Sequence, residues 1–100
     1  MDLQEHIAAL GSDTAAEHLS SLTAEELAAL EAELEGLFRA MRAGEIDGTE
    51  PDDLDALNVV ATAIRAVRAE DTLRVEAAAE ETRLAEERAA AALAIEAELL

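Results

Sequence analysis

The chain has 100 residues, with 24 Asp and Glu against 7 basic residues, and a formal net charge of −17. Every basic residue is Arg, and so acidic a chain is repelled by nucleic acid and by anionic membranes, so we expect no direct binding to either. The absence of Cys excludes disulfides and thiolate metal sites.

The N-terminal segment, residues 1–21, predicts a short helical arm of one or two helices. Its start, MDLQEHIAALGSD, lacks the basic residues and long apolar run of a secretion signal, so we expect a soluble, intracellular protein. Leu3, Ile7 and Leu10 share one helical face before GSDT breaks the helix. A second short helix after Thr14 and a mobile arm remain alternatives.

A helix over about 23–43 has the clearest start signal in the chain. Thr23 and Glu26 have the spacing of a capping box, and Leu22 can pack on Leu27 as a hydrophobic staple. The large apolar residues then alternate in steps of three and four, which is typical of a coiled-coil seam. The members of this seam are Leu27, Leu30, Leu34, Leu37, Phe38 and Met41.

An acidic turn over 44–50 leads to a long helix predicted over about 51–98. Gly44 ends the first helix, and Pro51 suits the first turn of the second because its missing N–H needs no partner there. The second half of the seam is Leu54, Leu57, Val60, Ile64 and Val67. We therefore predict an all-α fold in which residues 22–100 form an antiparallel helical hairpin with a long, extended, coiled-coil-like second helix.

The seam ends after Val67, where the same register meets Asp71 and Arg74. Four aliphatic residues follow that have no partner left in the chain: Leu73, Leu84, Ile95 and Leu99. The first three recur every eleven residues, which is compatible with a nearly straight seam. Because the hairpin alone is marginally stable, we interpret these residues as a self-association arm and expect a homo-oligomer.

Catalytic and ligand-binding motifs are missing. The acidic residues around the turn lack the pattern of a calcium loop and are interpreted as a solvated turn; they are Glu45, Asp47, Glu50, Asp52, Asp53 and Asp55. His6 and His18 lack the spacing of metal ligands and are interpreted as surface residues. We expect no enzymatic activity, no cofactor and no metal site.

Residues 19–100 resemble a known viral family. The stretches LTAEELAALEAELEGLFRAMRAGEIDG and LDALNVVATAIRAVRAEDTLRVEAAAEETRLAEERAAAALAIEAEL are similar to the N-terminal segment of major capsid proteins from tailed phages of actinobacteria. In that family such a delta-like scaffolding region precedes the shell-forming domain. The shell domain has no counterpart in these 100 residues, so the resemblance implies that the chain continues past Leu100.

The resemblance implies a scaffolding domain that promotes and shapes procapsid assembly by helix–helix association and is later cleaved or displaced. Its partners would be other capsid subunits and the shell-forming domain of the same chain, in the host cytoplasm and the procapsid interior. The alternative is a stand-alone cytoplasmic coiled-coil adaptor or regulatory protein, which predicts a small discrete oligomer and a reading frame that stops near Leu100.

Overall fold

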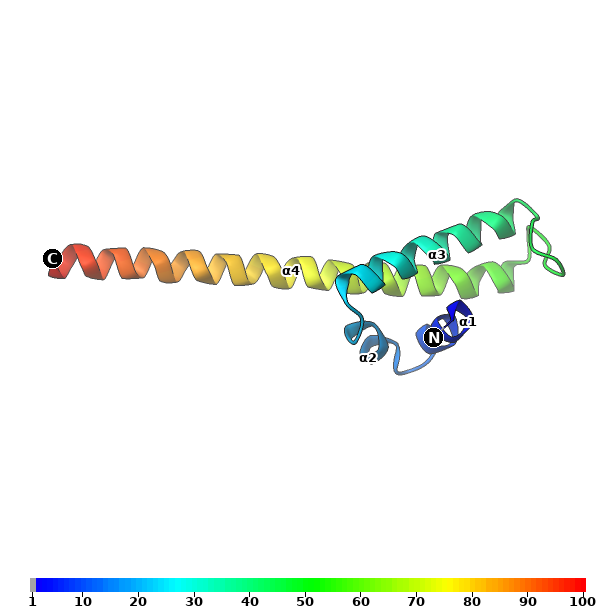
Figure 1. Cartoon of the computed structure of the whole chain (residues 1–100), viewed down its shortest axis with the longest axis horizontal. Coiled ribbons are helices and arrows are strands. Elements are labelled where there is room, and N and C mark those ends of the chain that lie inside the picture. The colour runs from blue at the N-terminus through cyan, green and yellow to red at the C-terminus, as the bar shows by residue number, and fades with distance from the viewer. Residues whose placement is uncertain (1) are drawn as a thin grey trace.

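The computed structural model describes residues 2–100 and is all-α. Its helices are α1 (Leu3–Leu10), α2 (Ala15–Ser20), α3 (Ala24–Arg42) and α4 (Leu54–Leu99), and residues 2–100 contain no strand. The molecule is elongated, 74 × 24 × 20 Å, because α4 continues far beyond α3 (Figure 1). The predicted fold class is confirmed: α3 and the first half of α4 form an antiparallel hairpin, preceded by two short helices.

Local signals fix both ends of α3. Thr23 Oγ1 accepts from the Glu26 N–H at 3.1 Å, and the Glu26 carboxylate accepts from the Thr23 N–H at 3.0 Å, which completes the capping box. The hydrogen bond that the Glu26 carboxylate accepts from the Thr23 N–H is the main cause that lowers the pKa of Glu26, and the Thr23 hydroxyl adds to it. At the other end Gly44 has a φ of +73°, and the Glu45 N–H donates to the Ala40 carbonyl, so the helix closes in a Schellman motif.

The connection to α4 is longer than the predicted turn. Pro51 lies in the turn that precedes the helix, and α4 begins at Leu54. The capping residue is Asp53, whose side chain accepts from the Ala56 N–H at 3.2 Å. An Asp side chain at this position satisfies an N–H that would otherwise lack a partner, which is why the helix starts there rather than at Pro51. Arg42 donates to the Pro51 carbonyl at 2.7 Å and ties the turn to α3.

Most of the predicted seam forms the core of the hairpin. Leu34 and Val67 are fully buried at its centre, and Leu37 and Phe38 are partly buried against it. The other buried members are Leu27, Leu30, Met41, Leu57, Val60 and Ile64. The placement of Leu54 in the seam was wrong, because this side chain is 71% exposed. As the first residue of α4, it lies to one side of the face that Leu57 presents to α3.

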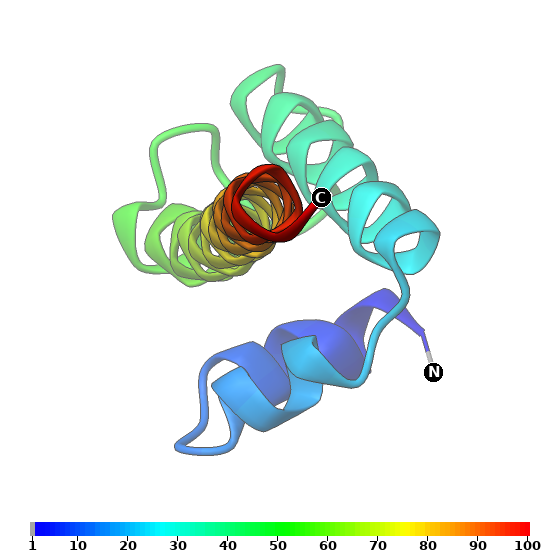
Figure 2. The same ribbon diagram turned by 90° about the vertical axis from the view of Figure 1, so that its left-hand side faces the viewer.

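The short helices are part of the same core. Figure 2 shows α1 and α2 side by side beneath the hairpin, and Ile7, Leu10 and Leu19 are buried with the seam residues. The core therefore has three walls: α3, α4 and the α1–α2 pair. This third wall adds the apolar contacts that two helices alone lack, so residues 3–20 pack on the hairpin rather than extending from it as an arm.

Candidate functional site

The second half of α4 projects away from the rest of the molecule (Figure 1). We call residues 75–99 the projecting arm. Leu73 at its base is 60% exposed, and Ile95 and Leu99 near its end are 56% and 74% exposed. Leu84 is half-buried. The structure thus leaves the four predicted self-association residues along one helix and brings none of them into the core.

Two further exposed aliphatic residues of the projecting arm had not been predicted from the sequence. Val75 is 63% exposed and Leu93 is 65% exposed. They do not fit the eleven-residue spacing, but their exposure follows from the same cause, because residues 75–99 extend past the start of α3. At about 100° per residue, Leu73, Leu84 and Ile95 lie within about 40° of each other and form one stripe.

The projecting arm has the sequence of a helix that persists without tertiary support. It is rich in Ala and Glu and contains neither Gly nor Pro. Arg83 pairs with Glu80 and Glu87 one turn away on either side, and its hydrogen bond lowers the pKa of Glu80. At about 25 residues the segment exceeds the length below which isolated helices are marginal. It is about 37 Å long at 1.5 Å per residue.

Arg74 fastens the base of the arm to the core. Its guanidinium donates to the carbonyl of Leu22 at 2.7 Å and to that of Leu19 at 3.0 Å, and pairs with Glu70 at 3.0 Å. The pair with Glu70 joins residues one turn apart on α4. The contacts of Arg74 with Leu19 and Leu22 could not be predicted from the sequence, because these carbonyls lie more than fifty residues earlier in the chain.

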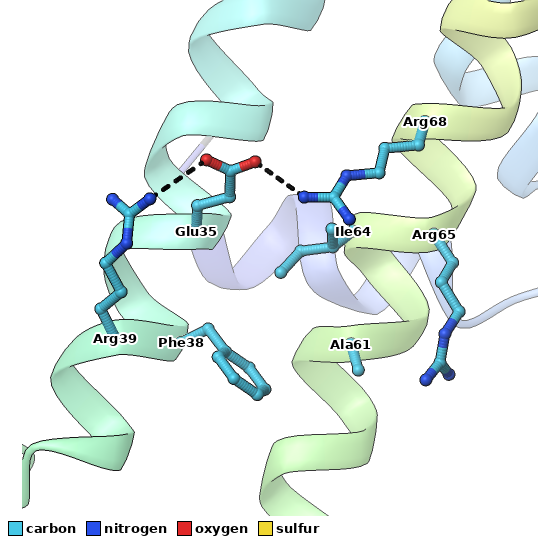
Figure 3. Close-up of a pocket in the computed structure, with 7 residues that line it drawn as sticks. All are labelled: Glu35, Phe38, Arg39, Ala61, Ile64, Arg65 and Arg68. Carbon is cyan, nitrogen blue, oxygen red and sulfur yellow. Dashed lines mark hydrogen bonds and ion pairs between the residues drawn. The ribbon is translucent and has the colours of Figure 1, made fainter.

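A groove lies between α3 and α4 on the face that Figure 3 shows. It has a volume of about 360 Å³, and Phe38, Ala61 and Ile64 form its apolar floor. Arg39, Arg65 and Arg68 surround this floor. No motif in the sequence predicts the groove, because its residues come from two helices and converge only once the register of these helices is known.

Carboxylates of α3 hold two of the three groove arginines. Arg68 pairs with Glu35 at 3.0 Å and with Glu31 at 3.3 Å, and these hydrogen bonds raise the pKa of Arg68. Glu35 also pairs with Arg39 at 3.7 Å. Arg65 forms no ion pair with any residue that the structure describes, so its guanidinium is available to a ligand.

The two histidines are not independent surface residues. His6 Nδ1 and His18 Nε2 lie 2.8 Å apart, and the pair is partly buried between α1 and α2. One ring must donate and the other accept, so this hydrogen bond requires at least one neutral ring. Among residues 2–100, no group of three His, Asp or Glu side chains is placed to hold a metal ion.

Within residues 2–100, no helix combines the length and the apolar character needed to cross a membrane.

Comparisons with known proteins identify no family for this chain. The sequence matches no protein-family model, no curated protein and no solved structure.

Proposed function

We propose that this chain is an assembly domain that joins copies of itself through the projecting arm. The observation that carries the proposal is the exposure of large aliphatic side chains along the part of α4 that extends beyond the other helices (Figure 1). Exposed apolar side chains that recur along one element are typical of interaction surfaces. The packed base formed by α1, α2, α3 and the first half of α4 serves to hold the arm in a fixed direction.

The composition of the arm favours weak and reversible contacts. Each buried aliphatic side chain contributes about 1.5–3 kcal/mol, whereas association alone costs about 4–15 kcal/mol. A pair of copies that buries only a few of these residues is therefore bound weakly. Many such contacts acting together stabilise a large assembly that still comes apart when it is remodelled.

The assembly that we propose is a phage procapsid. The resemblance of residues 19–100 to the N-terminal segment of actinobacteriophage capsid proteins supports this proposal, and weak, repeated association suits a scaffold that is later cleaved or displaced. The net charge of −17 also fits the role. Many acidic copies inside a closed shell repel nucleic acid during assembly, in the host cytoplasm, before the genome enters.

The test is to express the complete reading frame that contains these residues, with and without residues 1–100, and to examine the products by electron microscopy. Regular shells from the complete frame and misshapen or absent shells from the shortened one support a scaffolding domain. A frame that stops at Leu100 and yields one small discrete oligomer refutes it in favour of a cytoplasmic adaptor.

A charge variant tests the repulsion separately. Replacing the five glutamates of the arm between residues 76 and 87 by glutamine removes negative charge without changing side-chain size. We expect more nucleic acid in the purified shells, measured by their absorbance ratio at 260 and 280 nm. Unchanged nucleic-acid content would contradict the proposed role of the charge.

A further inference from the structure

The groove between α3 and α4 concentrates positive charge in an acidic protein. Three of the 7 basic residues of the chain line it. With Glu31 and Glu35 counted against Arg39, Arg65 and Arg68, the cluster retains one net positive charge, whereas the whole chain carries −17. The local positive charge therefore favours an anionic ligand in the groove.

Two of the groove arginines, Arg39 and Arg65, lie on opposite sides of the groove and can still pair with a ligand, because the one ion pair of Arg39, with Glu35, is long at 3.7 Å. Arg39 lies on α3, with its side chain 78% exposed, and Arg65 lies on α4 without a partner among the described residues. Between them Phe38, the only aromatic residue of the chain, is partly buried next to Ala61 and Ile64. The groove thus fits a ligand with an apolar ridge and a carboxylate on either side of it.

The end of α4, residues 95–99, has this composition. Ile95 and Leu99 are one turn apart and more than half exposed, so they form an apolar ridge. At about 100° per residue, Glu96 and Glu98 lie about 80° to either side of that ridge. We call residues 95–99 the acidic tip.

The acidic tip cannot reach the groove of its own chain. α4 is a single helix from Leu54 to Leu99, and the 27 residues from Arg68 to Ile95 separate the two by about 40 Å at 1.5 Å per residue. An acidic tip that docks in this groove therefore belongs to a second copy.

We infer that the acidic tip of one copy docks in the arginine-lined groove of another, with Ile95 and Leu99 on the apolar floor and Glu96 and Glu98 paired with Arg39 and Arg65. This inference rests on the proposed self-association and specifies its interface. The two surfaces in contact differ, so each copy still offers a free groove or a free tip after it has bound once. Such a head-to-tail contact extends into rings or open chains, unless two copies exchange tips and close as a dimer.

Charge reversal tests this contact in the whole chain by sedimentation velocity over a range of concentrations. The groove variant R39E/R65E and the tip variant E96R/E98R should each raise the dissociation constant at least about tenfold. The matched controls R83E/R88E and E81R/E86R make the same changes in net charge at positions on the arm outside the tip. Circular dichroism establishes that every variant retains its helices.

The decisive sample is the fourfold variant R39E/R65E/E96R/E98R, which has the net charge of the wild type because the change of −4 in the groove cancels the change of +4 at the tip. Its basic tip fits its acidic groove, so association should return. Association that stays lost, or that falls equally in the controls, overturns the tip-in-groove contact. If the wild type associates and the groove variant does so equally well, the tip-in-groove contact is refuted while self-association stands. A wild type that remains monomeric at all concentrations refutes both.

Discussion

Arg74 is the residue whose replacement tests most directly how the short helices are held on α4. It supplies the only hydrogen bond to the Leu22 carbonyl among the described residues, whereas the Leu19 carbonyl also accepts from the Leu22 N–H at 3.1 Å. Its side chain is 30% exposed and that of Glu70 only 14%. Replacing Arg74 by Met keeps the aliphatic stem but removes all three contacts.

The expected loss of stability follows from these contacts. A hydrogen bond made by a charged group contributes about 1.5–3 kcal/mol, and partial exposure places Arg74 at the lower end. One such bond to Leu22, a partly redundant one to Leu19 and the unpaired Glu70 together give about 2–3 kcal/mol. Arg74→Lys should recover about half, because an ammonium lacks the planar fork that reaches carbonyl and carboxylate together.

Urea denaturation followed by circular dichroism measures the effect, and we expect the midpoint of Arg74→Met to fall by about 1–2 M. Hydrogen exchange should quicken first at the amides of α1 and α2. Arg88→Met is the matched control, since it makes the same change of charge on α4 at a residue with no ion pair in the described part of the chain; its effect should stay within about 0.5 kcal/mol. Equal midpoints for the two variants would refute the role assigned to Arg74.

Four other substitutions test the same structure. Gly36→Ala should stabilise the protein by about 0.5–1 kcal/mol, because Gly36 lies in a helix interior and nothing is within 4 Å of the added methyl group. Gly44→Ala should destabilise it by about 1 kcal/mol, because the φ of Gly44 is +73°. In thermal unfolding, the midpoint should rise for the first variant and fall for the second. Leu34→Ala should cost about 3–5 kcal/mol in urea denaturation, since Leu34 is 0% exposed, and a loss below about 1 kcal/mol would contradict its central position. Because the pKa of Glu26 is lowered in the folded protein, its charge contributes fully to stability above the ordinary pKa of 4.5, and this contribution is lost as the pH falls through the lowered pKa. Wild type should therefore exceed Glu26→Gln in stability at about pH 6 and match it at about pH 3, and a difference independent of pH would disprove this origin.

The hairpin could be predicted because its signals are local and periodic. The capping box of Thr23 and Glu26 marks where α3 begins, and alternating steps of three and four residues identify the buried face of each helix. Periodicity fails at the ends of a helix, where no neighbouring turn constrains the side chain. Leu54 has apolar character and nearly the right spacing, yet it is exposed because it is the first residue of α4.

The remaining features depend on contacts between distant parts of the chain. Ile7, Leu10 and Leu19 are too few to show which surface their short helices cover, so their burial beneath the hairpin had no clear signal. Arg74 looked like an interruption because the pattern of a single helix does not show which carbonyls another segment brings to it. The groove likewise needs the relative positions of α3 and α4, which no motif in either helix encodes.

The unbroken course of α4 makes this helix a molecular ruler. It has neither Gly nor Pro between Leu54 and Leu99 at which the helix could bend. The number of residues therefore sets both the distance from the core to the tip and the rotation of the tip about the helix axis. One inserted residue lengthens the arm by only about 1.5 Å but swings its end by about 100°. Seven inserted residues lengthen it by about 10.5 Å and restore the original heading to within about 20°. An insertion therefore changes the direction in which the end of the arm points far more than it changes the length of the arm.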